Sequence, residues 1–260
     1  MRVDAVGHFG ALVRGPEPPL DRAALAIAAG TDPGLDEGRW LAELDRLAAG
    51  VRTLPGLVQR LFETEGFAGN AADYLDPRNS LLPYVLTRKL GIPITLAVVA
   101  IEVGRRAGVA LEGVGMPGHF LVRPVGTRKH LDVFRGGTEL DMAGCEALFR
   151  ATSGARPDVP FGPYLLATAS TRSILARMLE NLRVVYRTRG RPADLEWVLR
   201  MRLALPGTGL AEVLELAAAL GEQGRWLDGA RLLEKRLPDA SPVGAERLRA
   251  AARSLRAHLN

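Results

Sequence analysis

The sequence predicts an α+β protein in which a buried helix packs against an antiparallel sheet, with helices before this core and an all-α tail after it. Three observations predict this fold. Residues 93–107 are an apolar run of helical length. Short segments rich in Val, Leu and Phe follow, bounded by Gly and Pro. From Ile174 onward the pattern is helical only, so we expect two domains, residues 1–165 and 166–260.

The N-terminal region is expected to be helical. Asp21 is predicted to cap a helix over residues 22–29, and Asp36 to start a second amphipathic helix. A third helix is expected over residues 54–65. The next segment, residues 66–80, is dense in turn-forming residues and is predicted to be an irregular loop, with Ser80 as the N-cap of a helix over residues 81–90.

The core elements follow from position 93. The helix is apolar on all sides, which indicates burial, and Gly108 is a natural C-terminal stop. Glu102 is an acid in this apolar helix, and Arg105 and Arg106, at i+3 and i+4, are its expected ion-pair partners. Three antiparallel strands are predicted behind the helix, over residues 111–116, 119–125 and 130–134.

The tail matches itself at an offset of 34 residues, which is the period of tetratricopeptide helix pairs. With barely two repeats it cannot form a long solenoid, so we expect it to pack on the first domain; an ordinary helical bundle is the alternative. The matched positions are Gly190-Arg191 with Gly224-Arg225, Asp194 with Asp228, Val198-Leu199 with Leu232-Leu233, and Arg202-Leu203 with Arg236-Leu237.

Composition narrows the function classes. A chain of 260 residues with 47% hydrophobic content belongs to the globular class, and without a signal peptide or an apolar span we expect it in the cytoplasm. Its single cysteine, Cys145, excludes an internal disulfide and a thiolate-rich metal site, and the four histidines suggest no metal site. No metal or cofactor is therefore expected.

The net charge is +5, yet the arginines of the last helix are spread along it without a nucleic-acid motif or interleaved aromatics. We therefore interpret the charge as ordinary surface charge rather than a nucleic-acid site. The partner we expect is a protein or peptide. The sequence leaves the oligomeric state open.

Residues 91–137 have the layout of a cysteine-hydrolase core. Acyl transfer requires a nucleophile, a base and an acid that orients the base. The chain has a helix start, His119 and Asp132 in this order. The helix start carries Pro93 in place of a nucleophile. Long motifs in the same order support this layout: Gly66-Phe67-Ala68-Gly69-Asn70, Asp76-Pro77-Arg78-Asn79-Ser80, Gly91-Ile92-Pro93-Ile94-Thr95 and residues 111–123 with Met116-Pro117-Gly118-His119-Phe120.

These motifs resemble the SirB-type transglutaminase-like family, and the resemblance covers nearly the whole chain. It implies a papain/transglutaminase-like core, a tetratricopeptide tail, a cytoplasmic location and a loosely defined regulatory role. The family's usual Asp-Pro-Phe-Asn-Gly-Gly is Asp-Val-Phe-Arg-Gly-Gly here, at residues 132–137, and the second tail repeat is degenerate. When Gly91, Ala97, Arg105 and Gly108 are laid on the pattern of active enzymes, Pro93 takes the place of the nucleophilic cysteine.

Proline offers neither a nucleophile nor an N–H at the helix start. Thr95 is the nearest hydroxyl, but about 100° of rotation per residue turns it roughly 200° away, so we expect it to bond the local backbone. Cys145, with Asp141 as a possible helix cap before it, is expected to be a buried small hydrophobe. Loss of the nucleophile in a comparable triad costs about a millionfold in turnover.

We therefore predict a non-catalytic transglutaminase-like protein-interaction or regulatory module. His119 and Asp132 are expected to be a hydrogen-bonded pair retained mainly for structure, with a ligand-binding or proton-transfer role as the alternative. The candidate groove is formed by Asn79, Ser80, Thr95, His119 and Asp132. A competing hypothesis is a hydrolase or amide-bond transferase that uses the pair with Thr95, Ser80 or Cys145 as an unconventional nucleophile. A third is nucleic-acid association through the arginine-rich tail.

Overall fold

Helices dominate the first ninety residues of this computed structural model, which describes residues 2–259. A small two-stranded parallel sheet precedes the core helix. In chain order the elements are α1 (Arg2–Arg14), α2 (Leu20–Ala28), α3 (Glu37–Ala48), α4 (Leu54–Val58), the π-helical turn Gln59–Thr64, β1 (Ala68–Gly69), the 3-10 turn Pro77–Ser80, α5 (Leu82–Arg88) and β2 (Leu90–Gly91).

The core is helix α6 (Pro93–Ala107), which packs against the first strands of a four-stranded antiparallel sheet, as predicted. Gly108 ends the helix in a left-handed conformation, with φ of 75°. The sheet order is β3-β4-β5-β6, and Leu111 pairs with Pro124 while Asp132 pairs with Thr138. Its strands are β3 (Leu111–Val114), β4 (Leu121–Pro124), β5 (His130–Asp132) and β6 (Thr138–Leu140).

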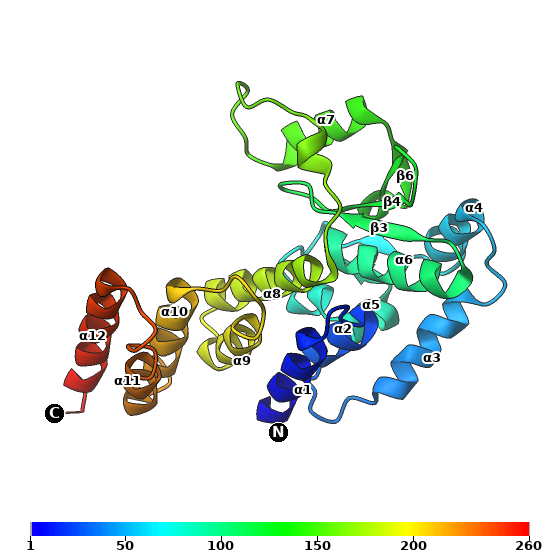
Figure 1. The fold of residues 1–260 in the computed structure, drawn as a ribbon. Coiled ribbons are helices and arrows are strands. Elements are labelled where there is room, and N and C mark those ends of the chain that lie inside the picture. The colour runs from blue at the N-terminus through cyan, green and yellow to red at the C-terminus, as the bar shows by residue number, and fades with distance from the viewer. Residues whose placement is uncertain (1, 260) are drawn as a thin grey trace.

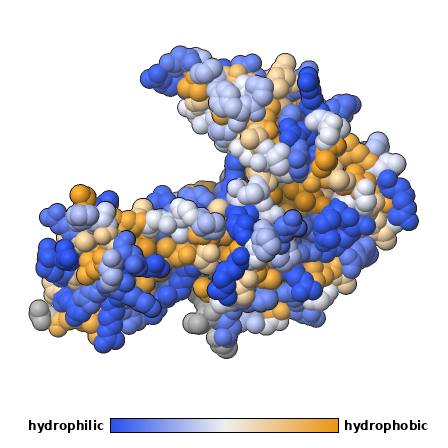
Figure 2. Space-filling model, viewed as in Figure 1, coloured by the Kyte–Doolittle hydropathy of each residue, from blue (hydrophilic) through white to orange (hydrophobic). Residues whose placement is uncertain are grey.

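Helix α7 (Met142–Thr152) and the segment after it form a lobe over the outer side of the sheet (Figure 1). From there the chain returns to the core and enters the tail, whose five helices run in a row away from the sheet (Figure 1). The surface is hollowed between the lobe and this row (Figure 2). The tail helices are α8 (Thr171–Thr188), α9 (Pro192–Arg202), α10 (Leu210–Gly221), α11 (Trp226–Glu234) and α12 (Pro242–Ala257).

The first tail helices share the main hydrophobic core with the N-terminal helices. Leu175, Leu179 and Trp197 belong to the same buried cluster as Phe9 of α1 and Val98 of α6. A separate small cluster joins α10, α11 and α12. The tail therefore packs on the first domain through α8 and α9, as expected, while its last helices pack on one another.

The 34-residue offset corresponds to structurally equivalent positions. In both helix pairs, α8–α9 and α10–α11, the turn between the helices contains a glycine with positive φ. An arginine then precedes the second helix and pairs with an aspartate three residues later. The distances are 2.5 Å for the first ion pair and 3.0 Å for the second. The equivalent residues are Gly190 and Gly224, Arg191 and Arg225, and Asp194 and Asp228.

Two predicted helix caps are wrong. Helix α2 begins at Leu20 with Pro19 before it, and Asp21 lies inside its first turn, because its carboxylate pairs with arginines of α6. Ser80 ends a 3-10 turn that Asp76 caps, and Leu81 precedes α5. Helix α1 and the short polar strand β6 were not predicted from the sequence. The predicted caps Asp36 and Asp141 are confirmed.

Candidate functional site

The start of α6 is built around Pro93. Ile92 occupies the N-cap position in an extended conformation, no side chain caps the helix, and Pro93 is buried at its first position. Proline suits this place because its fixed φ and missing N–H cost nothing in the first turn. The position that a nucleophile would occupy therefore presents a ring carbon and no reactive atom.

His119 and Asp132 are in direct contact. The two residues come from the loop before β4 and from the end of β5, and the distance from His119 Nε2 to Asp132 Oδ1 is 2.8 Å. Both side chains are buried, with 6% and 0% exposed. The Phe134 N–H also donates to Asp132 Oδ1, and its ring meets the imidazole edge-on at 6.0 Å. This leaves Nδ1 as the imidazole nitrogen that is not bonded to the carboxylate.

Two further contacts position the histidine. Gly118 turns the chain just before it with φ of 77°. Arg177 of α8 donates from Nη1 to the Met116 carbonyl at 3.0 Å and from Nη2 to the His119 carbonyl at 2.7 Å. The first tail helix thus holds the loop that carries the imidazole. Sequence reasoning missed Arg177, because nothing near it in the sequence indicates a partner 58 residues away.

The other predicted groove residues lie inside the protein. Asn79, Ser80 and Thr95 have exposed fractions of 0%, 2% and 0%. Asn79 receives a hydrogen bond from the Asn70 side chain at 3.0 Å and donates to the Asp73 carbonyl at 2.7 Å, so it ties the polar loop together. In this structure these side chains form part of the interior, and whether they line a ligand groove stays a prediction.

No hydroxyl or thiol of the described residues is hydrogen bonded to the His119 ring. The expected backbone bond of Thr95 is wrong: its Oγ1 is buried and has no partner within the described chain. Cys145 lies in α7 within an apolar cluster, and burial, together with the charges of Asp141 and Asp132, raises the pKa of its thiol to about 11. This thiol is therefore protonated at neutral pH, a poor state for a nucleophile.

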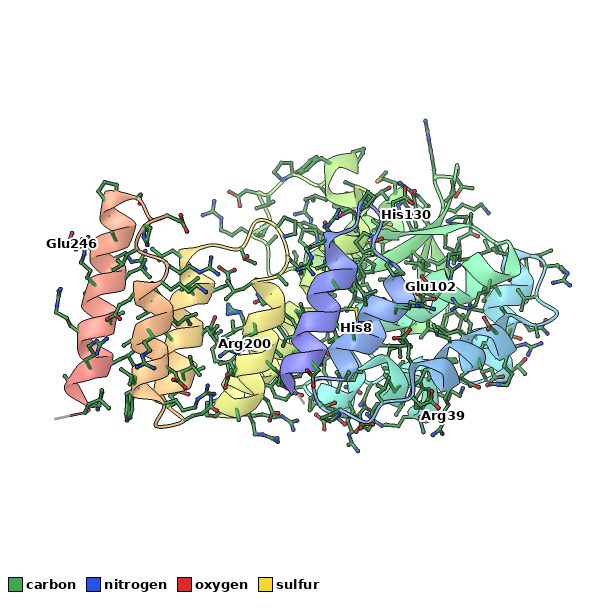
Figure 3. All side chains as sticks on the ribbon, turned by 60° about the horizontal axis from the view of Figure 1, so that its bottom comes forward. His8, Arg39, Glu102, His130, Arg200 and Glu246 are labelled. Carbon is green, nitrogen blue, oxygen red and sulfur yellow. The ribbon has the colours of Figure 1, made fainter. Side chains whose placement is uncertain are left out.

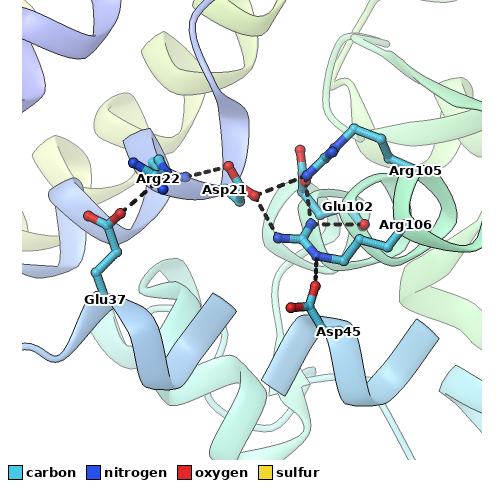
Figure 4. Close-up of polar contacts among 7 residues, drawn as sticks. All are labelled: Asp21, Arg22, Glu37, Asp45, Glu102, Arg105 and Arg106. Atoms are coloured by element: carbon cyan, nitrogen blue, oxygen red, sulfur yellow. Dashed lines mark hydrogen bonds and ion pairs between the residues drawn. The ribbon is translucent and has the colours of Figure 1, made fainter. Parts of the chain in front are cut away.

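The predicted ion pair of Glu102 belongs to a larger network, in which Glu102 and Asp21 are buried and Asp45 is exposed. Glu102 contacts Arg105 at 2.8 Å and Arg106 at 2.7 Å, as expected. Arg106 also reaches Asp21 of α2 at 2.6 Å and Asp45 of α3 at 2.7 Å, so one guanidinium joins three helices (Figure 4). The sequence indicated the local pairs, but not the two aspartates.

Besides His119, His130 of β5 is the other buried histidine of the described chain (Figure 3). Its exposed fraction is 3%, and neither ring nitrogen has a hydrogen-bond partner within the described chain. Burial, with a smaller effect of Arg123, lowers its pKa below the ordinary 6.5, and a weak contact with the Arg128 backbone only partly opposes this. The folded protein therefore resists protonation of His130 more strongly than the unfolded chain does.

We expect His130 to weaken folding in mild acid. As the pH falls below 6.5, His130 becomes protonated in the unfolded chain before it does so in the folded chain. The free energy of unfolding therefore falls by up to about 1.4 kcal/mol per pH unit until the folded-state pKa is reached. Urea denaturation of the wild type and of His130→Phe at several pH values measures this. The difference between their pH slopes should appear below pH 6.5, and equal slopes in the two proteins would contradict the role of His130.

No group of three or more His, Cys, Asp or Glu side chains in residues 2–259 is arranged to hold a metal ion. Within the same part of the chain, no helix has the length and apolar character needed to cross a membrane.

In the transglutaminase-like class of cysteine hydrolase folds, a buried helix begins at the nucleophile position, and an antiparallel sheet with a bonded histidine–aspartate pair follows it. This chain has the same arrangement of elements. The profile of the transglutaminase-like superfamily matches residues 37–180, more than half of the chain. The chain therefore belongs to this family.

The chain is also similar to several curated proteins. It is 38% identical over 182 residues to a UPF0162 protein of Xylella fastidiosa, and this alignment covers 65% of each chain, just under two thirds. It is 36% identical over 188 residues, or 68% of each chain, to the UPF0162 protein PA3419 of Pseudomonas aeruginosa. A shorter segment of 132 residues is 30% identical to the human F-box only protein 21, of which it covers 20%.

Proposed function

We propose that this chain is a non-catalytic transglutaminase-like protein of the SirB type, which acts in the cytoplasm as a protein-interaction or regulatory module. The observation that carries the proposal is Pro93, buried at the first position of α6 where the family's enzymes have their nucleophile. The substitution removes the reacting atom and leaves the rest of the core intact. Binding is the function that such a core retains.

The remaining nucleophile candidates support the same conclusion. Thr95, Ser80 and Cys145 are all at most 2% exposed, so a substrate carbonyl cannot reach them in this structure. None is hydrogen bonded to the imidazole, so none has a base to remove its proton. The raised pKa of Cys145 further lowers its thiolate content.

We propose that the tail is tetratricopeptide-like and binds a protein or peptide. The repeated geometry of the two helix pairs supports this, because glycine, arginine and aspartate recur at a 34-residue offset in equivalent positions. Nucleic-acid association is less well supported. Tail arginines such as Arg183, Arg191 and Arg256 already pair with acidic side chains, which leaves less free positive charge for a phosphate backbone.

The alternative function is a hydrolase or amide-bond transferase. The observation that favours it is the bonded pair itself, because Asp132 on Nε2 leaves His119 Nδ1 available for a proton transfer. Under this alternative, Thr95, Ser80 or Cys145 would become the nucleophile after a movement of the surrounding chain.

Intact-mass spectrometry after treatment with an alkyl fluorophosphonate, which modifies activated hydroxyls, and with iodoacetamide, which modifies thiols, distinguishes the non-catalytic module from the enzyme. We expect the wild-type protein and His119→Ala to give the same adducts, because no nucleophile is coupled to His119. Urea-unfolded wild type is the positive control for the iodoacetamide probe, because unfolding exposes the buried thiol of Cys145, the single cysteine of the chain. A wild-type adduct that His119→Ala abolishes would contradict the proposal and favour the enzyme.

A further inference from the structure

The tail and α1 enclose a cleft that the histidine–aspartate pair does not touch. Its volume is about 610 Å³, within the range of about 300–1,000 Å³ typical of ligand sites. It lies where α9 faces α10 and α11, and Figure 3 shows Arg200 of α9 at this boundary. The apolar part of its lining comes from Trp197 and five aliphatic side chains, Val6, Ala193, Leu203, Leu216 and Leu232.

The polar part of the lining is positive. Arg200, Arg225 and Arg236 lie beside one carboxylate of the lining, that of Glu196, and Arg225 also pairs with Asp228 at 3.0 Å, so one positive charge of the lining, that of Arg236, is left without an acidic partner among the described residues. Glu196 is already saturated: Arg200 and Arg225 each reach it at 2.8 Å, and the Gln223 side chain donates to it at 3.2 Å. Burial opposes its ionisation, but these donors outweigh burial and hold the pKa of Glu196 below its usual value.

Arg236 has no such partner. It follows α11, is exposed, and forms no ion pair with any residue between positions 2 and 259. The three arginines come from α9, from the start of α11 and from the segment after α11, so the cations are spread along the cleft. A single small anion would meet only part of this set, whereas an extended chain with several carboxylates would meet more of it.

Trp197 provides a second, independent observation. Its side chain lines the cleft and is 2% exposed, and its indole N–H has no hydrogen-bond partner among the described residues. A buried donor without an acceptor is costly and rare in folded proteins. The N–H is closed to solvent in this structure, so a carboxylate or a peptide carbonyl of a ligand would bond it only once the side chains over it move aside.

We infer that this cleft binds an acidic peptide segment of a partner protein, with an aliphatic side chain of the peptide on the apolar floor and its carboxylates on Arg200, Arg225 and Arg236. The aliphatic floor and the buried Trp197 disfavour nucleic acid, which needs exposed aromatic rings for base stacking. The inference deepens the proposed binding role of the tail. It does not depend on whether the core is catalytic.

Fluorescence anisotropy of the full chain with a fluorescein-labelled peptide of alternating Glu and Leu tests this inference. The same peptide with Gln in place of Glu is the neutral control, and labelled oligo-dT is the nucleic-acid control. We expect the acidic peptide to bind, its affinity to fall with salt, and both controls to bind more weakly. Equal binding of the two peptides, no binding of the acidic peptide, or preferred binding of oligo-dT would overturn the inference.

Three variants locate the site. Arg236→Glu reverses an exposed, unpaired charge and should weaken the acidic peptide by at least about tenfold. Ala193→Trp, at an exposed position of the same lining, should block the cleft by volume with no change of charge. Arg249→Glu makes the same charge change on α12 outside the lining and should have little effect. An equal loss in Arg236→Glu and Arg249→Glu, or full binding by Ala193→Trp, would contradict the assignment.

A failure here is distinguishable from a failure of the proposed function. If the acidic peptide does not bind while the mass experiment still gives no His119-dependent adduct, the cleft assignment is wrong and the non-catalytic core stands. If an adduct appears while the peptide binds, the core is catalytic and the cleft assignment stands.

Discussion

Replacement of Arg106 by Met is expected to cost about 3–5 kcal/mol of folding free energy, because it removes the buried cation that Asp21 and Glu102 share and leaves them only the solvent-exposed Arg105. The Arg106 side chain is 11% exposed and bonds Asp21, Asp45 and Glu102 together (Figure 4). Methionine keeps most of the apolar stem, so the loss reports the charge and its hydrogen bonds. The measurement is urea denaturation followed by circular dichroism, with the shift in midpoint at constant slope.

Arg105→Met is the matched control. Arg105 contacts the same two carboxylates, at 3.1 Å for Asp21 and 2.8 Å for Glu102, but its side chain is 60% exposed. Solvent screens such a pair, so we expect a loss of at most about 1 kcal/mol. Equal losses in the two variants would contradict the view that Arg106 is the buried centre of the network.

The pH dependence of the Arg106 variant has a definite sign. In the wild type, burial disfavours the ionised Asp21, but Arg106 and the Arg22 N–H hold its pKa below the usual value, while burial and the charge of Asp21 raise the pKa of Glu102. Without Arg106 both folded-state pKa values rise. A folded state with raised carboxyl pKa values gains stability as the pH falls, so the deficit against the wild type should shrink from pH 7 towards pH 5. Adding Glu102→Met should also recover part of the loss.

Gly118→Ala is expected to cost about 2–5 kcal/mol of folding free energy, because backbone strain and overpacking add together. Gly118 has φ of 77°, and a Cβ there would overlap the backbone of Thr152 and lie 2.6 Å from Ser153 Cα. Backbone atoms of α7 and its C-terminus cannot move aside as a flexible side chain could. The substitution should therefore displace the loop that carries His119 and break its contact with Asp132.

Gly126→Ala separates the two causes of this loss. Gly126 has the same φ of 77°, but nothing lies within 4 Å of its added Cβ. It should therefore show only the strain of a left-handed alanine, about 1–2 kcal/mol. Thermal denaturation of both variants gives the comparison, and the imidazole resonances of His119 report whether the pair persists. Similar losses in both, with an undisturbed His119, would contradict the close approach to α7.

Local signals predicted the core well. The apolar helix from Pro93 to the stop at Gly108 and the ion pair of Glu102 appear where they were predicted. The three predicted strands are present but shorter, and the predicted end of the third, at residues 133–134, lies in a 3-10 turn. Their determinants lie within a few residues in the sequence. The misassigned caps have the opposite origin: Asp21 is a reasonable cap by its local sequence, but arginines more than eighty residues away take its carboxylate.

The candidate site divides in the same way. The order of Pro93, His119 and Asp132 could be predicted because family motifs carry it, and the spacing of thirteen residues between histidine and aspartate fits two neighbouring segments of one sheet. Arg177 could not be predicted, because its contact with the His119 carbonyl depends on where α8 lies relative to the loop before β4. The burial of Asn79, Ser80 and Thr95 depends equally on the packing of helices around them.

The sequence by itself determined the family, the α+β order of elements, the proline at the start of α6 and the 34-residue offset in the tail. Each of these rests on residue identity or on spacing within one segment. Only the tertiary structure decided which charges share a buried network, that the first tail helix holds the His119 loop, and that α1, α9 and α11 enclose an arginine-lined cleft. Those features require side chains from distant segments to meet, and residue patterns along a single chain do not specify the angle at which two helices pack.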